Sequence, residues 1–294
     1  MMDKAIVVGV DGSQAAKAAL AWAADDAVRT GLPLRIVHVR EPWRRETEPT
    51  ASNVRETMAE WHMLLLGESA EQARAFAPAA QVSTALATGA VVQRLKTEAE
   101  TAATLVVGGK GHGRLPTFAI GSVTAELAGH TASPLVVVRT FTMEQRGEIV
   151  IGYDGSPDAD AAMAFALEQA RFRAARIRVL HGSRYPALAP HPVGYGPVPM
   201  GETNELAGRL ALWREKSPHV EMVETIVPGS AVSALVEASR TADLVVVGSR
   251  GRGGFASAVL GSVSHSVVRR ARCAVAVVSA ARPDDPNRAD DPHR

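Results

Sequence analysis

Two segments of the sequence carry glycine and serine at the same spacing. Each reads G-x-x-G, then nine residues, then G-S, and each follows a short run of valines; the segments are residues 108–122 and 248–262. Glycine lets a backbone approach a ligand closely, and the free N–H groups and dipole at the start of a helix favour a phosphate. The pattern therefore predicts two polyphosphate cradles in one chain.

The first four residues of each cradle are expected to form a loop beyond a strand. Gly108 and Gly248 stand where the preceding strand is expected to end, so that the chain can turn beside a ligand. Gly111 and Gly251 are expected to keep the loop tight and to expose backbone N–H groups. A single pattern of this kind also fits a turn that only permits close helix–sheet packing. Its repetition with the same spacing favours the ligand interpretation.

The last two residues of each cradle are expected to begin a helix. Gly121 and Ser122 would open this helix in the first copy, and Gly261 and Ser262 would open it in the second. Each serine can add a hydroxyl donor to the backbone N–H groups of the first turn. A phosphate is therefore expected between the glycine loop and this helix start.

Charged residues accompany both cradles. Asp11 and Asp154 are expected to end the first strand of each copy, where a carboxylate could accept hydrogen bonds from a ribose or adenine, or lie near a metal. The alternative is that the aspartate, or the serine two positions on, caps the following helix. Four basic side chains in the glycine loops could contact phosphates, although basic residues are common on exposed loops: Lys110, Arg114, Arg250 and Arg252.

The elements that must position these residues also occur twice. The segment GVDGS at residues 9–13 recurs as GYDGS at residues 152–156. These two five-residue segments are 143 positions apart, whereas the two cradles are 140 positions apart. The second copy is therefore three residues shorter between its first strand and its cradle. Self-similarity on this scale indicates two copies of a whole domain, not a solenoid of small repeats.

Each copy alternates apolar, β-branched runs with helical patterns. Such alternation predicts parallel strands with helices on both faces of the sheet. We therefore expect an α/β fold of two tandem, doubly wound parallel-sheet domains, Rossmann-like, with five strands each. The expected strands are residues 5–10, 34–39, 81–87, 104–109 and 134–139, then 148–153, 176–181, 220–227, 243–248 and 274–279. In such sheets ligands bind beyond the carboxyl ends of the strands, which is where the cradles fall.

Length and composition agree with this organisation. The 294 residues divide into a first domain (1–140), a linker (141–147), a second domain (148–280) and a polar, proline-broken tail (281–294) that is expected to be disordered. The net charge of +1 gives no reason to expect a nucleic acid or a membrane as partner. Cys273 is the only cysteine, so no intrachain disulfide forms. With no signal peptide at the start, a cytoplasmic protein is expected.

At these residues the sequence resembles the universal stress proteins in their tandem two-domain form, over residues 3–139 and 147–280. The glycine pattern and the aspartates Asp11 and Asp154 match the family's ATP-binding members. The resemblance implies an adenine nucleotide alpha hydrolase-like fold and ATP, with Mg²⁺, as the cofactor. It also implies phosphate contacts from Val123 and Val263, which follow the cradle serines.

The resemblance further implies a backbone contact to adenine from the residue after the second strand's histidine. Val39 follows His38 in the first copy, whereas Gly182 follows His181 in the second. The change to glycine keeps the backbone contact and weakens the apolar one, so the first adenine site is favoured. The two histidines are expected to orient strand ends rather than to hold zinc.

Association is expected through the fifth strand of each copy. A sheet edge made of apolar residues leaves unpaired backbone groups exposed. The resemblance implies that residues 134–139 and 274–279 pair within the chain, and two chains would then form a homodimer, the commonest oligomer.

Three classes of function remain open. The leading hypothesis is an ATP-binding regulator in a stress or dormancy response, with one site per domain and an unknown protein partner. No catalytic set is evident, since neither loop carries a Walker lysine, and at most slow ATP hydrolysis is expected. The alternatives are a weak ATPase or adenylate-transferring enzyme of the same fold class, and an interaction scaffold that no longer binds a ligand.

Overall fold

The protein is described by a computed structural model over residues 4–42, 52–111, 120–183, 200–252 and 260–280. The predicted disordered tail at 281–294 and the predicted phosphate contact Arg114 lie outside the described residues. No helix among the described residues is long and apolar enough to cross a membrane.

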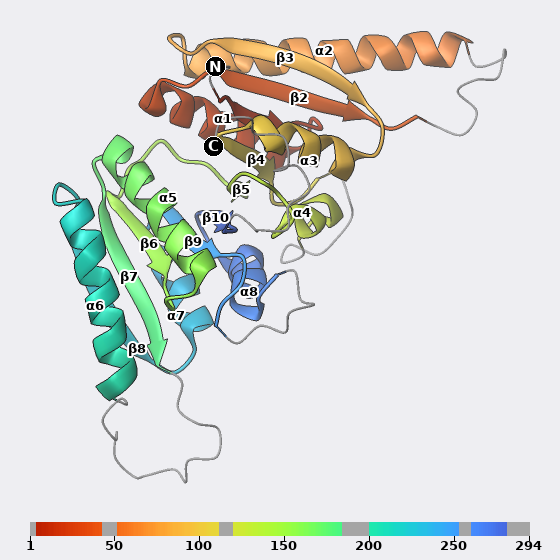
Figure 1. Ribbon diagram of the computed structural model, residues 1–294. Coiled ribbons are helices and arrows are strands. Elements are labelled where there is room, and N and C mark those ends of the chain that lie inside the picture. Colours follow the sequence, from red (N-terminus) through yellow and green to blue (C-terminus); the bar gives the residue numbers. More distant parts are fainter. Residues whose placement is uncertain (1–3, 43–51, 112–119, 184–199, 253–259, 281–294) are drawn as a thin grey trace, which may run out of the picture.

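The strands form one sheet of ten in the order β3-β2-β1-β4-β5-β10-β9-β6-β7-β8 (Figure 1). Each half of this order is the same five-strand arrangement, and the predicted two tandem doubly wound units are confirmed. The strands of the first half are β1 (Ile6–Gly9), β2 (Leu34–Arg40), β3 (Val82–Thr88), β4 (Thr104–Gly108) and β5 (Leu135–Val138). Those of the second half are β6 (Glu148–Gly152), β7 (Arg176–Ser183), β8 (Met222–Pro228), β9 (Leu244–Gly248) and β10 (Ala274–Val278).

The two halves join through their fifth strands. Neighbouring strands within each half are parallel, whereas β5 and β10 pair antiparallel, with Val137 opposite Val275 and Val136 opposite Ala276. The predicted pairing of these two segments within one chain is therefore confirmed. It covers two sheet edges that would otherwise expose backbone N–H and C=O groups.

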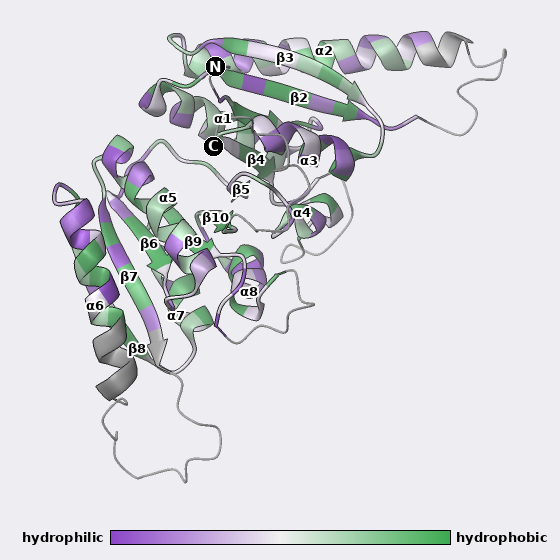
Figure 2. Cartoon of the chain, viewed as in Figure 1, coloured by the Kyte–Doolittle hydropathy of each residue, from purple (hydrophilic) through white to green (hydrophobic). Residues whose placement is uncertain are grey.

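Helices cover both faces of the sheet. One buried hydrophobic cluster takes side chains from α1 (Gln14–Thr30), α2 (Ser52–Phe76), α5 (Pro157–Arg173) and α6 (Met200–Lys216). The cluster on the other face takes side chains from α3 (Val91–Thr101), α4 (Ser122–Leu127), α7 (Ala231–Ala238) and α8 (Ser262–Arg270). In Figure 2, β2 and β7 alternate hydrophobic with hydrophilic residues, and the helices also carry both kinds. The central strands β4, β5, β9 and β10 are almost entirely buried. This is the pattern expected of strands buried on both faces.

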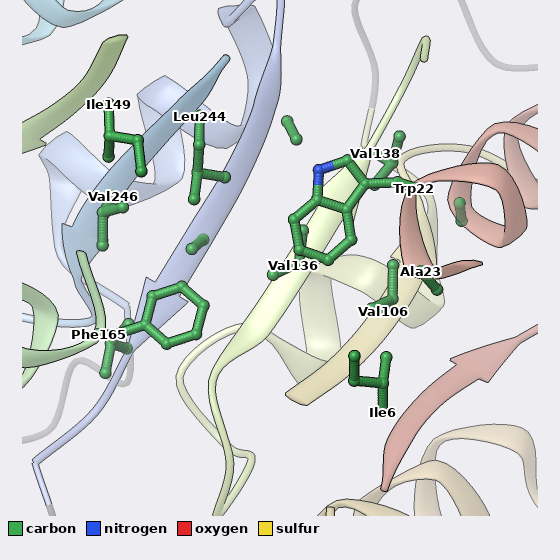
Figure 3. Close-up of a cluster of buried hydrophobic side chains, with 14 of the residues drawn as sticks. Ile6, Trp22, Ala23, Val106, Val136, Val138, Ile149, Phe165, Leu244 and Val246 are labelled. Carbon is green, nitrogen blue, oxygen red and sulfur yellow. The ribbon is translucent and has the colours of Figure 1, made fainter. Parts of the chain in front are cut away.

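The first of these cores continues across the junction of the two halves. Figure 3 shows Trp22, Val136 and Val138 from the first half near Phe165 and Leu244 from the second. All five side chains are buried, with at most 7% of any of them exposed. The two repeats therefore share packing on this face as well as strand pairing.

The first helix of each half begins in the same way. Gly12 and Gly155 adopt positive φ angles of 84° and 74°, which glycine tolerates best. The hydroxyl oxygens of Ser13 and Ser156 then accept hydrogen bonds from the backbone N–H groups three residues on, at 3.2 Å in both halves. This capping fixes where α1 and α5 begin, directly beyond the carboxyl ends of β1 and β6.

Candidate functional site

A cavity of about 310 Å³ lies beyond the carboxyl end of β1. It is bordered by the turn after β1, by β2, by the amino-terminal half of α3, and by the loop and helix that follow β4. The structure brings all seven site residues predicted for the first copy to this one cavity. These residues are Asp11, Val39, Gly108, Gly111, Gly121, Ser122 and Val123.

The two ends of this cavity differ in chemistry. One end is apolar and is formed by the side chains of Val37, Val39, Val91, Leu95 and Val107. The other end is formed by backbone of the glycine loop, with Lys110 and Ser122 as polar side chains and with the first turn of α4. An apolar slot that opens onto backbone N–H groups suits a ligand with a planar apolar part and an anionic part.

Gly108 is a glycine because α1 packs against it. A Cβ atom at this position would lie 2.8 Å from the carbonyl carbon of Ala15 and 2.9 Å from the nitrogen of Ala16. Gly248 has the same relation to α5, where the Cβ would lie 2.8 Å from the carbonyl carbon of Asp158. The sequence prediction explained the first glycine of each cradle by close approach to a ligand, whereas close approach of a helix to the end of the strand accounts for it.

Gly111 and Gly251 are glycines because an aspartate lies against each of them. A Cβ at Gly111 would lie 2.6 Å from Oδ2 of Asp11, and one at Gly251 would meet Oδ2 of Asp154. In the second half that oxygen also accepts a hydrogen bond from the backbone N–H of Arg252 at 2.9 Å. Asp154 therefore holds its glycine loop close to the turn that follows the first strand, and Asp11 lies against the corresponding loop.

The same aspartates brace the turn itself. Both lie two residues beyond the end of their strand, rather than at its last residue as the sequence predicted. Oδ1 of Asp11 accepts from the N–H of Ser13 at 2.9 Å, and Oδ1 of Asp154 accepts from the N–H of Ser156 at 3.0 Å. The sequence left open whether the aspartate or the serine caps the following helix. The serine caps it, and the aspartate accepts a hydrogen bond from the backbone of the turn.

Gly121 differs from the other two glycines of its cradle. Its φ of −62° is accessible to any residue, and a Cβ there would make ordinary contacts, the nearest being 3.5 Å from the Cα of Lys110. Gly261 has a similar φ of −66°, but a Cβ there would lie 3.3 Å from the carbonyl oxygen of Ser249, which is closer than an ordinary contact. No contact with the described residues of the first half requires glycine at position 121, and a side chain there would lie at the border of the cavity.

The second half places its predicted residues at the equivalent positions. Gly182 lies in β7 opposite Val227, as Val39 lies in β2 opposite Ala87. Gly261 is the N-cap residue of α8, so that its cradle opens a helix as Gly121 does. Of the remaining predicted residues of this half, Asp154 lies in the turn after β6, Gly248 ends β9 and Gly251 lies in the loop after β9. Ser262 and Val263 begin α8.

A buried carboxylate makes the second half different. Asp158, only 6% exposed, accepts hydrogen bonds from the hydroxyl of Ser249 at 2.6 Å and from the backbone N–H groups of Arg250 and Ala280, both at 3.0 Å. The Nε atom of Arg250 lies 3.8 Å from the same carboxylate. Arg250, predicted as a phosphate contact, is thus turned towards Asp158. The first half has Ala15 at this position and no such carboxylate.

The model of the Universal stress protein family matches residues 2–139 and again residues 146–279. The chain belongs to the universal stress protein family.

Relatives of this universal stress protein match along almost its whole length. Universal stress protein Rv2623 of Mycobacterium tuberculosis is 33% identical over 284 residues, which cover 92% of this chain and 95% of the relative. Universal stress protein Mb2019 of Mycobacterium bovis is 32% identical over 307 residues, with 96% of each chain covered. The tandem arrangement is therefore shared with these relatives.

A solved structure shows the same fold at lower identity. The crystal structure of a universal stress protein from Archaeoglobus fulgidus superposes with a TM-score of 0.75, at 19% identity, and covers 96% of this chain and all of that one. At this identity the likeness supports the fold of the universal stress protein and nothing about its ligand.

Sequence reasoning missed two hydroxyls that fix the cradles. Thr124 donates a hydrogen bond to the carbonyl oxygen of Gly108 at 2.9 Å, and Ser264 donates to that of Gly248 at 2.6 Å. Each hydroxyl ties the first turn of its helix to the end of the preceding strand. The available signal was a small hydroxyl residue three positions after the last glycine in both repeats.

The histidines of the universal stress protein act as the sequence suggested, on the ends of strands. Nδ1 of His38 lies 2.7 Å from the carbonyl oxygen of Val10, and Nδ1 of His181 lies 2.9 Å from that of Tyr153. Each ring therefore links the second strand of its half to the turn that follows the first strand.

Proposed function

We propose that this universal stress protein binds ATP with Mg²⁺, at one site in each repeat, and acts as a nucleotide-dependent regulator in a cytoplasmic stress or dormancy response. The observation that carries the proposal is the convergence of seven predicted residues on one cavity with an apolar end and a glycine-rich end. Its volume of about 310 Å³ falls within the range of small-molecule sites.

The proposed orientation follows from the two ends of the cavity. Adenine fits the apolar end, between the side chains of Val39, Leu95 and Val107, with its edge at the backbone of β2. The phosphates fit against the loop and the first turn of α4, where Ser122 and Lys110 add donors. The described residues around Gly121 do not require a glycine there. The space that a side chain at this position would fill is then available to a phosphate.

Mg²⁺ would arrive on the phosphates of ATP. No group of three or more histidine, cysteine, aspartate or glutamate side chains that could hold a metal occurs among the described residues. The chain's own part in binding is therefore to present donors and to keep side chains out of the phosphate path.

We propose that the second site is the weaker one. Two differences support this ranking: Gly182 offers less apolar surface to a base than Val39, and Asp158 places a buried carboxylate beneath the loop that would receive the phosphates. Like charges in such proximity disfavour each other. The side chain of Arg250, held near Asp158, offsets part of this repulsion.

The test is a titration of the purified protein with ATP in the presence of Mg²⁺, followed by calorimetry. Saturable binding is expected, with competition from AMP at the apolar end and weaker competition from inorganic triphosphate. Absence of any binding by the wild-type protein would contradict the proposal. The scaffold alternative would then explain the glycines by packing alone.

The homodimer expected from the sequence has to form on a surface outside the edges of β5 and β10. The edges of β5 and β10 are joined within the chain, so the free edges of the sheet are those of β3 and β8. We propose association of two chains, and of an unidentified protein partner, on surfaces outside the central strands. Sedimentation equilibrium with and without ATP measures the first, and a monomer at all concentrations would rule it out.

A further inference from the structure

A second cavity of about 310 Å³ lies between α1 and α2, on the face of the sheet opposite α3. Its floor is formed by Val10, Leu20 and Leu65, all at most 7% exposed. Trp61 forms a wall, and the side chain itself is 45% exposed. In Figure 1, α2 is the long helix that runs beside α1 and β3. This cavity shares Val10 and Ala16 with the lining of the nucleotide cavity, and its other lining residues do not border that cavity.

The second repeat has other residues at the places that border this cavity. The offset of 143 positions that relates the two first strands aligns Val10 with Tyr153 and Lys17 with Asp160. α2 and α6 end in the same way: the backbone N–H of Ala77 donates to the carbonyl oxygen of Ala73, and that of Ser217 donates to the carbonyl oxygen of Trp213. Matching these two ends relates the helices by an offset of 140 positions. That offset aligns Ser69, on the rim of the cavity, with Arg209.

Those three residues of the second repeat fill the corresponding space. The phenol of Tyr153 is 2% exposed, and its hydroxyl donates to Oδ1 of Asp160 at 2.5 Å. Nη1 of Arg209 lies 3.0 Å from Oδ2 of the same aspartate. The Cδ atom of Arg209 lies 3.5 Å from the place of a Cβ on Gly155. A buried ring, its hydroxyl and an ion pair therefore occupy what is empty volume in the first repeat.

The first repeat lacks that ring. Valine in place of tyrosine removes a phenol, and lysine and serine replace the ion pair at the rim. Large apolar side chains removed from a packed interior leave cavities, and an apolar cavity of about 150 Å³ binds benzene in another protein. The cavity beside α2 has room for one ring and a polar substituent.

Trp61 offers a flat surface for such a ring. Its indole contacts the ring of His62 edge-to-face, with 5.1 Å between centroids, and that of His38 at 5.8 Å. The two histidines are buried and joined at 2.7 Å, from Nε2 of His38 to Nδ1 of His62. An aromatic wall held by fixed neighbours favours offset or edge-to-face contact with an aromatic ligand.

The rim favours an uncharged polar group. Lys17 and Glu68 place one cation and one anion there, and Ser69 and Gln72 add neutral donors and acceptors. Neither an anion nor a cation is selected by this mixture, whereas a hydroxyl can both donate and accept. The chemistry of the rim thus agrees with the shape of the vacated space.

We propose that the cavity between α1 and α2 binds a small phenol, with the ring between Trp61 and the apolar floor and the hydroxyl at the rim near Lys17 and Ser69. The ligand then takes the place that the side chain of Tyr153 takes in the second repeat. The universal stress protein would carry one ligand site of this kind per chain, since its second repeat fills the space itself.

The probe is p-cresol, which is the side chain of tyrosine as a free molecule. Binding to the full chain is followed by nuclear magnetic resonance at the indole N–H of Trp61, assigned with the variant Trp61→Phe. A saturable shift in the millimolar range is expected. Toluene, which lacks only the hydroxyl, is expected to bind about fivefold more weakly, the loss of roughly one hydrogen bond.

Two independent variants give the cavity the residues of the second repeat. Val10→Tyr installs the ring, and Lys17→Asp with Ser69→Arg installs the ion pair without altering Val10. Val10→Tyr is expected to weaken p-cresol binding by about tenfold or more, as competition by an attached group requires. Lys17→Asp with Ser69→Arg restores the carboxylate that accepts from the hydroxyl of Tyr153 in the second repeat, so it is expected to tighten p-cresol binding and not toluene binding. The reciprocal variant Tyr153→Val should create a second p-cresol site in the other repeat.

The outcomes separate cleanly. A Trp61 shift lost in Val10→Tyr supports the proposal, and tighter p-cresol binding in Lys17→Asp with Ser69→Arg or a gained site in Tyr153→Val strengthens it. No saturable shift at Trp61 in the wild-type protein overturns it. Binding that survives Val10→Tyr unchanged also overturns it, because p-cresol would then lie elsewhere.

Discussion

The carboxylate of Asp26 in α1 meets the guanidinium of Arg173 in α5, with 2.7 Å between Oδ1 and Nη2, across the boundary of the two repeats. Asp26 is 1% exposed, and Nε2 of Gln169 also lies 3.5 Å from it. The guanidinium stands 4.9 Å from the ring centroid of Trp22. The ion pair adds a polar link between the repeats to the pairing of β5 with β10.

Replacing Arg173 should destabilise the protein strongly. The variant Arg173→Met keeps most of the apolar packing on Trp22 but leaves a buried carboxylate without its cation. A loss of about 3–5 kcal/mol in the free energy of unfolding is expected. The double variant Asp26→Leu with Arg173→Met should recover most of it, measured by denaturant unfolding of both. Equal stability of wild type and Arg173→Met would show that the pair contributes nothing.

The loss in Arg173→Met should also depend on pH. Burial raises the pKa of the Asp26 carboxyl above its ordinary value, and the cation of Arg173 opposes that rise. Without Arg173 the folded state holds the proton more tightly than the unfolded state. Its contribution to stability is then present at low pH and is lost as the pH rises through the folded pKa. The variant should therefore lie closer to wild type at pH 4 than at pH 8, and the opposite trend would contradict this.

Cys273 should be unreactive in the folded protein. Burial raises the pKa of its thiol to about 12, and the residue is 8% exposed. Because the thiolate is the nucleophile, reaction with a thiol reagent at pH 8 should follow only unfolding. Ellman's reagent is expected to label less than one thiol per chain over hours in buffer and one per chain at once in guanidinium chloride. Rapid labelling in buffer would refute this.

Tyr153 should make stability fall at high pH. Burial, with the hydrogen bond to Asp160, raises the pKa of its phenol to about 12. The folded state therefore keeps a proton that the unfolded state releases from about pH 10 upwards. The free energy of unfolding should fall more steeply between pH 10 and pH 12 in wild type than in Tyr153→Phe. Parallel curves for the two proteins would place the phenol in solvent.

Two glycines of the first cradle should respond differently to the same change. Gly108→Ala sets a Cβ against the backbone of α1 and should cost about 1–3 kcal/mol of stability. Gly121→Ala meets only ordinary contacts and should cost less than about 1 kcal/mol. Nucleotide binding at the first site should nevertheless drop about tenfold or more in Gly121→Ala, because the added methyl takes phosphate space. Thermal melts and ATP titrations of both variants measure this, and unchanged binding in Gly121→Ala would assign that glycine to packing.

The sequence predicted the repeats and their strands because apolar, β-branched runs and glycine spacing are local signals. It also anticipated that residues 134–139 and 274–279 pair, since an apolar strand at an edge needs a partner. The reason for Gly108 was not accessible in this way, because it depends on where α1 lies against β4. The brace between Asp11 and Gly111 likewise joins residues far apart in sequence.

The cavity between α1 and α2 could not be predicted either. A valine after the first strand is ordinary in any α/β protein. It becomes informative only when the buried phenol of Tyr153 is seen at the equivalent place, with Asp160 beside it. The burial of Asp158 could not be predicted for the same reason. A carboxylate in the first turn of a helix is common, and the sequence does not show that a loop covers it.

The central claim is that each repeat holds one ATP, and stoichiometry tests it most directly. Calorimetric titration with ATP and Mg²⁺ should give two sites per chain for the wild-type protein. Gly121→Asp and Gly261→Asp, each shown to be folded by circular dichroism, should each keep one site, and the double variant should keep none. No binding by wild type, or two sites in both single variants, would contradict the account.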